Sequence, residues 1–187
     1  MIEVKPRSDI VAPFSAAPGR LIAFEVDDDG YWRSEVRALF EGNYAFKIRA
    51  DSRVPVPACP YLECFTLSLE RGQYHSELPR RIDPPFRIVG ISLLRREEWC
   101  VPAPELTGKT AGNNPHIMMS GPPGSANPSA VAAILVTAGL LFTSDDSRQI
   151  AVLTSSQIPL NVDWVQEPEL LNEVLQEHSV ERVWHSA

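Results

Sequence analysis

Cysteine is scarce in this chain, with three residues among 187. A small and odd number of cysteines is typical of a reducing compartment and argues against a disulfide-linked secreted scaffold. The N-terminal segment, residues 1–14, also lacks the basic region and apolar run of a secretory signal. Both features favour a cytoplasmic protein, and we expect its thiols to be buried as small apolar groups.

Long apolar segments and a surplus of positive charge are lacking as well. The longest uncharged apolar stretch covers residues 130–142, whereas a membrane-spanning helix needs about 20 residues. The chain has 24 acidic and 17 basic residues, which gives a net charge of −7. An acidic protein repels phosphate backbones and anionic lipids, and the basic clusters at Arg80-Arg81 and Arg95-Arg96 are small. We therefore expect neither a nucleic acid nor a membrane as a partner.

Two segments resemble nucleotide or calcium motifs but lack essential positions. Gly108-Lys109-Thr110 matches the end of a phosphate-binding loop, yet Ala103 stands where that loop needs its first glycine. The segment 27–30 resembles the middle of a calcium loop, but Val36 occupies the position of its last carboxylate. A tight hairpin turn explains residues 27–30 more simply, because Asp-Gly tolerates positive φ.

Catalytic and zinc-binding patterns are also missing. Cys59 and Cys64 lack a Cys or His pair at zinc spacing, and no Gly-x-Ser-x-Gly elbow occurs. The histidines, which form no metal-binding set, are His75, His116, His178 and His185. His178 stands at the end of a predicted helix, where a cation interacts favourably with the helix dipole, so we expect a structural role. The sequence thus predicts no catalytic residue, no metal and no cofactor, and it favours a protein that is not an enzyme.

The most informative positive feature is an internal similarity. Residues 21–32 align without a gap on residues 88–99, which places Trp32 on Trp99. The further matches are 38–40 with 140–142 and 43–56 with 147–160. Trp32 lies 8 positions before Phe40, whereas Trp99 lies 43 positions before Phe142. The similarity predicts two copies of one β-rich unit, the second of which contains an insertion.

The expected fold is mainly β (α+β): two similar antiparallel β units from an internal duplication form a pseudo-symmetric barrel or sandwich with one C-terminal helix. We divide the single compact domain into an irregular lead-in (1–20), a first β repeat (21–70), a connector (71–85), a second β repeat (86–166) with an inserted loop (101–130), and a C-terminal helix and tail (167–187).

Alternating apolar residues predict the individual strands. The expected strands cover 21–26, 31–40, 44–50, 64–70, 86–94, 134–143, 149–155 and 161–165. At 134–143 a second interpretation stays open, in which Asn127-Pro128 begins a short helix through the nearby alanines that Gly139 ends. Leucines and Val174 on one face predict a helix at 167–178. The tail 180–184 either adds an edge strand or closes the barrel mouth.

The inserted loop is the best candidate for a binding segment. It is rich in proline, glycine and asparagine, and unstructured loops of this length are usually functional or disordered. His116, Ile117, Met118 and Met119 place an imidazole and apolar groups within it. Methionines adapt to partners of different shape, and loops on rigid scaffolds commonly bind partners. The other interpretation is a loop without function.

Two classes of function remain after these exclusions. The sequence favours a non-catalytic protein-interaction module, such as an adaptor, an inhibitor or an immunity-type partner that neutralises another protein. The alternative is an enzyme or a small-ligand-binding protein with a site between the two β repeats, where clefts commonly form. Exposed strand edges favour pairing with another chain, so a homodimer is a further expected assembly.

Overall fold

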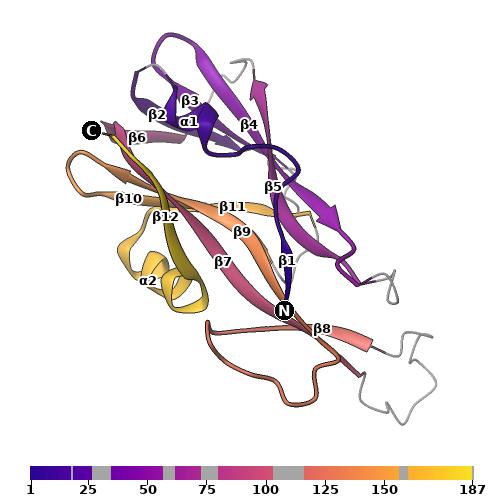
Figure 1. Ribbon diagram of the computed structural model, residues 1–187. Helices are drawn as coiled ribbons and strands as arrows, with labels where there is room; N and C mark the ends of the chain where they lie inside the picture. The colour runs from indigo at the N-terminus through magenta and orange to yellow at the C-terminus, as the bar shows by residue number, and fades with distance from the viewer. Residues whose placement is uncertain are drawn as a thin grey trace.

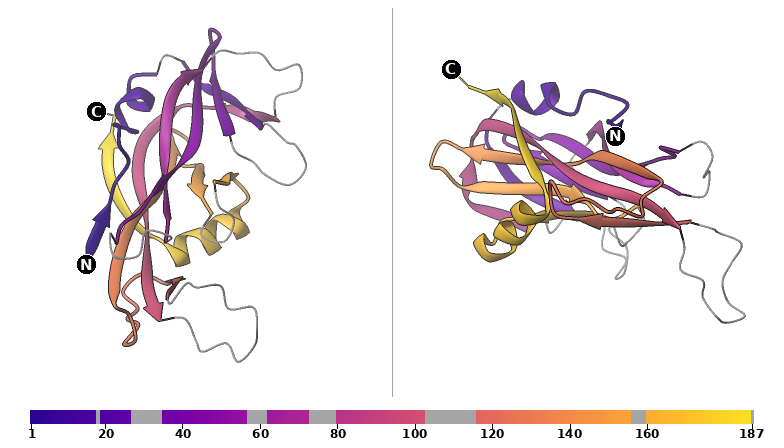
Figure 2. Two further views of the ribbon diagram at one scale, coloured as in Figure 1. Left: turned by 90° about the vertical axis from the view of Figure 1, so that its right-hand side faces the viewer. Right: turned by 60° about the horizontal axis from the view of Figure 1, so that its bottom comes forward.

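The chain folds mainly into β-structure, as the sequence predicts (Figure 1). A computed structural model describes residues 1–17, 19–26, 35–56, 62–72, 80–102, 116–155 and 160–186. Within these ranges the strands form two sheets, one of five and one of seven strands, accompanied by two helices. Figure 2 shows the two sheets from two further directions.

The five-stranded sheet contains the N-terminal strands in antiparallel order. Its strands are β2 (Leu21–Val26), β3 (Glu35–Phe40), β4 (Tyr44–Arg53), β5 (Cys64–Gly72) and β6 (Arg80–Phe86). Their spatial order is β5-β4-β3-β2-β6. The alternation predicted for β4 is confirmed, because Phe46 and Ile48 lie in the core while Lys47 and Arg49 make ion pairs outside it. Residues 27–34, which include Trp32 and the predicted hairpin turn, lie outside the described residues.

The seven-stranded sheet contains the C-terminal strands and the N-terminus. Its strands are β1 (Ile2–Val4), β7 (Ile88–Pro102), β8 (His116–Gly121), β9 (Ala132–Ser144), β10 (Gln149–Thr154), β11 (Val162–Val165) and β12 (Ser179–His185). The main order is β11-β10-β9-β7-β12, with β1 beside β9 and β8 beside β7. The tail therefore forms an edge strand, which is the first of the two alternatives.

The two sheets share one strand order. In each, four strands follow one another in a meander and a fifth returns to pair with the first: β2, β3, β4, β5 with β6, and β7, β9, β10, β11 with β12. All of these pairs are antiparallel. Aligned residues also share the same core, which contains the pairs Phe24 and Ile91, Phe40 and Phe142, Phe46 and Ile150, and Ile48 and Val152.

The main core lies between the two sheets and is rich in aromatic rings. Phe24 of β2 stacks on Trp164 of β11 with ring centroids 4.9 Å apart. Phe14 of the short helix α1 (Ala12–Ser15) contacts Phe46 and Phe142 at 4.8 and 4.7 Å. Aromatic pairs in such tilted or offset geometry add to the free energy gained from burying their area. The rings thus hold both sheets and α1 together.

Helix α2 (Pro168–Glu177) packs on the other face of the seven-stranded sheet (Figure 1). Its Leu171 belongs to one buried cluster with Leu94, Leu141 and Ala151, which alternate along their strands with residues of the main core. Pro168 occupies the first turn, where its missing N–H costs nothing. The predicted helix at 167–178 is confirmed. In the described part of the chain, no helix is long and apolar enough to cross a membrane.

Three details of the sequence-based prediction need correction. The lead-in 1–20 contains β1, which pairs in parallel with Ile134–Val136 of β9, and α1, where the carboxylate of Asp9 accepts from the backbone N–H groups of Val11 and Ala12. The connector 71–85 contains most of β6, whose Pro84-Pro85 is tolerated because β6 is an edge strand. The alternative helix near 130–139 is wrong, since β9 begins at Ala132 and pairs with β7.

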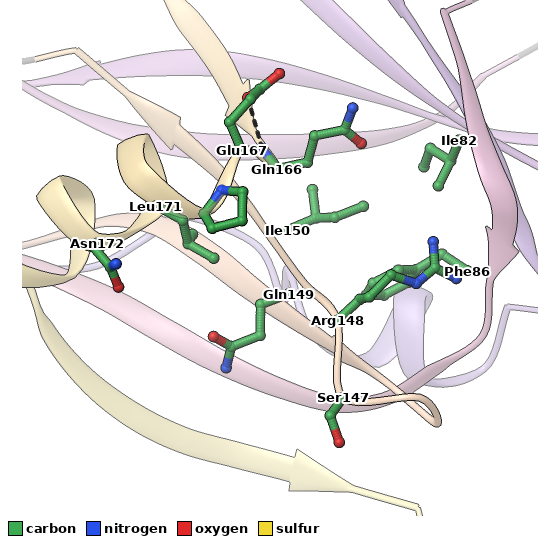
Figure 3. A pocket seen from close by; sticks show the side chains of 11 residues that line it. Ile82, Phe86, Ser147, Arg148, Gln149, Ile150, Gln166, Glu167, Leu171 and Asn172 are labelled. Atoms are coloured by element: carbon green, nitrogen blue, oxygen red, sulfur yellow. Dashed lines mark hydrogen bonds between the residues drawn. The ribbon is translucent and has the colours of Figure 1, made fainter.

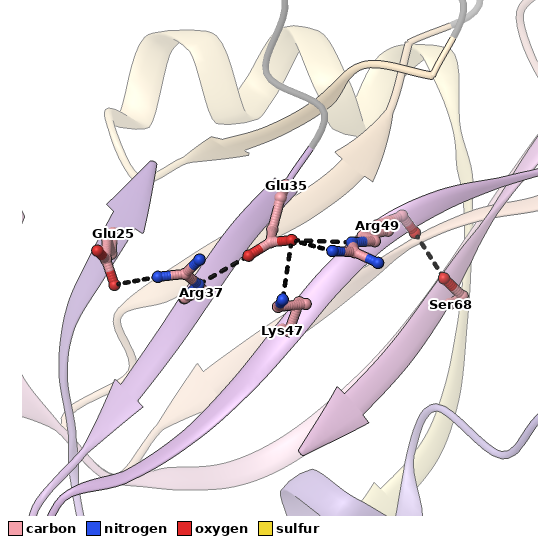
Figure 4. Close-up of polar contacts among 6 residues, drawn as sticks. All are labelled: Glu25, Glu35, Arg37, Lys47, Arg49 and Ser68. Atoms are coloured by element: carbon pink, nitrogen blue, oxygen red, sulfur yellow. Dashed lines mark hydrogen bonds and ion pairs between the residues drawn. The ribbon is translucent and has the colours of Figure 1, made fainter. Parts of the chain in front are cut away.

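A charged cluster covers part of the outer face of the five-stranded sheet (Figure 4). Glu35 is 5% exposed and accepts hydrogen bonds from Arg37 Nε at 2.7 Å and Arg49 Nε at 2.8 Å. Lys47 Nζ lies 3.3 Å from the same carboxylate, and Arg37 also pairs with Glu25. Burial alone would raise the pKa of Glu35, but hydrogen bonds from Arg49, Arg37 and Lys47 together lower it. The cluster is therefore a structural ion-pair network that joins β2, β3 and β4.

Candidate functional site

A pocket lies where the two sheets and α2 meet (Figure 3). Its volume is about 540 Å³. Its wall contains residues of β6, of the β9–β10 turn with the start of β10, and of the first turns of α2: Ile82, Phe86, Ser147, Arg148, Gln149, Ile150, Gln166, Glu167, Pro168, Leu171 and Asn172. The pocket thus lies between residues of the two sheets.

Arg148 fixes the shape of this pocket rather than offering a free charge. Its Nη1 donates to the Pro84 carbonyl oxygen at 2.8 Å, and its Nη2 donates to the Pro85 carbonyl oxygen at 3.3 Å. Its Nε donates to Asp146 at 2.8 Å, and its guanidinium lies 5.6 Å from the centre of the Phe86 ring. Arg148 therefore connects the β9–β10 turn to β6.

Apart from Arg148 and the carboxylate of Glu167, the lining offers uncharged hydrogen-bonding groups and apolar surface. The amides of Gln149, Gln166 and Asn172 can each donate and accept hydrogen bonds, while Ile150 and Leu171 supply apolar surface. Pockets of this size with a few polar groups commonly hold small ligands.

The predicted binding segment is a strand at the edge of the larger sheet. His116 begins β8, and its side chain lies outside the described residues. Ile117 and Met119 are 40% and 45% exposed on one face of β8, whereas the side chain of Met118 packs against the buried clusters that contain Val4 and Cys100. Among the described residues β8 pairs with β7 alone. Residues 103–115 of the inserted loop 101–130 lie outside the described residues.

Strand β8 pairs with β7, and its Gly121 lies close to the Trp99 ring. A Cβ at position 121 would lie 2.6 Å from two atoms of the Trp99 ring. Trp99 itself is buried and pairs with Met119. A side chain at position 121 would collide with the Trp99 ring, so this close approach requires glycine.

We expect Gly121→Ala to lower the free energy of unfolding by about 1–3 kcal/mol, because the Trp99 ring must move away. Hydrogen exchange of the β8 amides should accelerate more than exchange in β9 or β10. Gly72→Ala is the control, since its Cβ would lie 3.4 Å from the nearest atom. Unchanged exchange in β8 of the Gly121→Ala protein would show that this contact does not hold the strand.

His178 differs from its predicted role as a helix-terminal cation. Burial and the nearby charge of Arg96 lower its pKa to about 4, although its hydrogen bond with the Val174 carbonyl opposes this shift. The imidazole is therefore neutral at pH 7. Sequence reasoning missed this, because the burial of His178 depends on the tertiary fold and Arg96 lies 82 positions earlier in the chain.

The cysteines match their predicted role where the structure describes them. Cys64 and Cys100 are buried, while Cys59 lies outside the described residues. Burial is the main cause that raises the pKa of the Cys64 thiol, which makes it inert. Within the described ranges no group of three or more His, Cys, Asp or Glu side chains could hold a metal ion.

Comparisons with known proteins give no relative. No family model matches the chain, and neither a curated protein nor a solved structure is significantly similar to it. Function must therefore be argued from the two sites themselves, the edge strand β8 and the pocket between the sheets.

Proposed function

We propose that this chain is a non-catalytic protein-interaction module that binds another protein through the edge of β8. The observation that carries the proposal is an edge strand with two exposed apolar side chains, Ile117 and Met119, on one face. An exposed edge offers unpaired N–H and C=O groups to an additional strand. A strand of the partner would supply main-chain hydrogen bonds, and its alternate side chains would contact Ile117 and Met119.

The class of partner follows from the same features. The acidic chain, with a net charge of −7, favours a partner with complementary basic surface. An adaptor, an inhibitor or an immunity-type protein that neutralises another protein would use such a surface. A second copy of this chain is a further partner that the edge can accept, which would give a homodimer. The buried thiols of Cys64 and Cys100 are in keeping with a cytoplasmic location.

We expect the double substitution Ile117→Asp and Met119→Asp to abolish partner capture while the melting temperature stays nearly unchanged. Both side chains are exposed, so charge there costs little stability but opposes an apolar contact. The measurement is an affinity pull-down from the native host, compared quantitatively by mass spectrometry, with sedimentation velocity for self-association. Val54→Asp is the control, because Val54 is 46% exposed and lies outside β8. Equal capture by wild type and double variant would contradict the proposal.

We further infer that the two sheets descend from one duplicated unit. Three observations support this: the ungapped match of residues 21–32 with 88–99, the shared strand order, and the shared core positions of aligned residues. In this scheme β8 is an addition found in the second unit and not among the described strands of the first. A segment added at a sheet edge is a natural place for a new binding function.

A small-ligand-binding protein is the second candidate function, and the pocket between the sheets favours it. The amide-bearing wall of Gln149, Gln166 and Asn172 suits a neutral polar ligand. A thermal-shift screen with neutral sugars and nucleosides tests this candidate. A stabilising compound whose effect disappears in a Gln149→Ala protein would support it, and the absence of any such compound would favour β8 as the functional site.

A further inference from the structure

Strand β8 lacks the protection that the other described sheet edges carry. Edge strands of soluble proteins usually contain charged side chains or proline, which oppose pairing with another chain. The sequence of β8, residues 116–121, contains no Asp, Glu, Lys, Arg or Pro. Every other edge strand that the structure describes contains such a residue: Glu3 in β1, Glu70 in β5, Pro84 in β6, Asp163 in β11 and Glu181 in β12. Among the described edges, β8 is therefore the best suited to accept a further strand.

The order of side chains along β8 is self-complementary. When a two-fold axis relates two antiparallel strands, the central residue lies opposite its own copy, and residues equally far before and after it lie opposite each other. With Met118 at the centre, Ile117 of each copy lies opposite Met119 of the other copy. Ile117 and Met119 are exposed on one face of β8, while Met118 packs into the molecule on the opposite face. This register therefore makes two apolar cross-strand contacts at once.

The neighbouring registers lack this match. A centre at Met119 would place Ile117 opposite Gly121, which has no side chain to contact. A centre at Ile117 would place Met119 opposite position 115, which precedes the first residue of β8. Each copy has a net charge of −7, but β8 itself is uncharged, so its self-pairing sets no like charges directly opposite each other.

We propose that the β8 edges of two copies of this chain pair with each other about Met118, and that this homodimer masks the edge that a partner protein uses. The inference rests on the proposed function, because it takes β8 as the binding edge, and it names what occupies that edge in the free protein. Main-chain hydrogen bonds join the two seven-stranded sheets into one. A single pair of short strands buries less area than stable complexes need, so the dimer is weak and dissociates on dilution.

Sedimentation velocity of the full chain tests the dimer, with concentrations from about 1 to about 500 μM to cover weak association. Wild type should change from monomer to dimer as its concentration rises. The double substitution Ile117→Asp and Met119→Asp should weaken the dimer at least about tenfold, because it sets like charges opposite each other. Val54→Asp, which lies outside β8, should dimerise like wild type. A wild type that stays monomeric, or a dimer that the double substitution leaves unchanged, would overturn the proposal.

Disulfide cross-linking tests the register. Ile117→Cys and Met119→Cys proteins, mixed in equal amounts and oxidised, should form a covalent heterodimer, since opposite Cβ atoms of paired strands lie about 4.5–5.5 Å apart. Each variant alone should cross-link much less, because its two new cysteines lie diagonally across the pair, about 7–8 Å apart. Wild type gives the background from its own three cysteines. Cross-linking that is equal in the mixture and in either variant alone would contradict the register about Met118.

Partner capture separates failure of this inference from failure of the proposed function. The cross-linked dimer should capture less partner from the native host than the same mixture after reduction, because its β8 edges are occupied. Equal capture by the two samples would overturn the masking of the edge. A monomeric wild type whose partner capture is lost on the double aspartate substitution would overturn self-pairing alone and leave β8 as the partner-binding edge.

Discussion

Gly139→Ala should destabilise the protein by about 3 kcal/mol or more, the largest loss that we expect from adding a single methyl group. A Cβ at this position would lie 2.5 Å from the Val152 carbonyl oxygen and 2.8 Å from the Leu153 Cβ. The first of these atoms belongs to the backbone of the paired strand β10, which cannot rotate away as a side chain would. Strand β9 would have to separate from β10 in the centre of the sheet.

Urea unfolding followed by far-ultraviolet circular dichroism measures this loss. Gly90→Ala is the matched control in the same sheet, because its Cβ would lie 3.4 Å from the Thr143 side chain, an ordinary contact. We expect the control to stay within about 1 kcal/mol of wild type. Unfolding of both alanine variants at the same urea concentration as wild type would contradict the close packing of β9 against β10.

Acidification should remove about 3 kcal/mol of stability through His178 alone. Its pKa is about 4 in the folded protein and about 6.5 in an unfolded chain. Between these values the unfolded chain binds a proton that the folded protein does not, so stability falls as pH decreases from about 6.5 to about 4. Above about pH 6.5 none of this stability is lost, and below about pH 4 His178 causes no further loss. Burial is the main cause, followed in the same direction by the charge of Arg96.

The free energy of unfolding, measured by urea titration at intervals from pH 7.5 to pH 4.5, tests this expectation. A His178→Phe protein should have an almost flat profile in this window, whereas the exposed His185→Gln control should keep the wild-type slope. The carboxylate of Glu35, whose pKa is lowered from 4.5, contributes a loss only at lower pH. An equal slope for wild type and His178→Phe would show that His178 is not the group that titrates.

Local patterns in the sequence predicted most strands and the helix, because each depends on neighbouring residues. Phe46 and Ile48 alternate with charged residues, and this pattern alone indicates a half-buried strand. Residues that the internal similarity aligns, such as Phe24 and Ile91, lie in one core, while descent of the two segments from one unit stays a prediction.

Features that depend on distant contacts could not be predicted in this way. Strand β6 contains Pro84-Pro85, which locally argues against a strand and is tolerated only because β6 occupies an edge. The pocket between the sheets needs β6, β10 and α2 together, and no local pattern indicates that they meet. The apolar character of Ile117 and Met119 identified them as binding candidates in the sequence. Their strand conformation could not be predicted in this way, because it depends on pairing with β7.

The most direct measurement of the central claim is hydrogen–deuterium exchange of the protein alone and in complex with the partner that it captures. Addition of a partner strand to β8 predicts slower exchange of the amides at 116–121, with the amides of α2 and β10 unchanged. Slower exchange around α2 and β10, with β8 unchanged, would contradict binding through this edge.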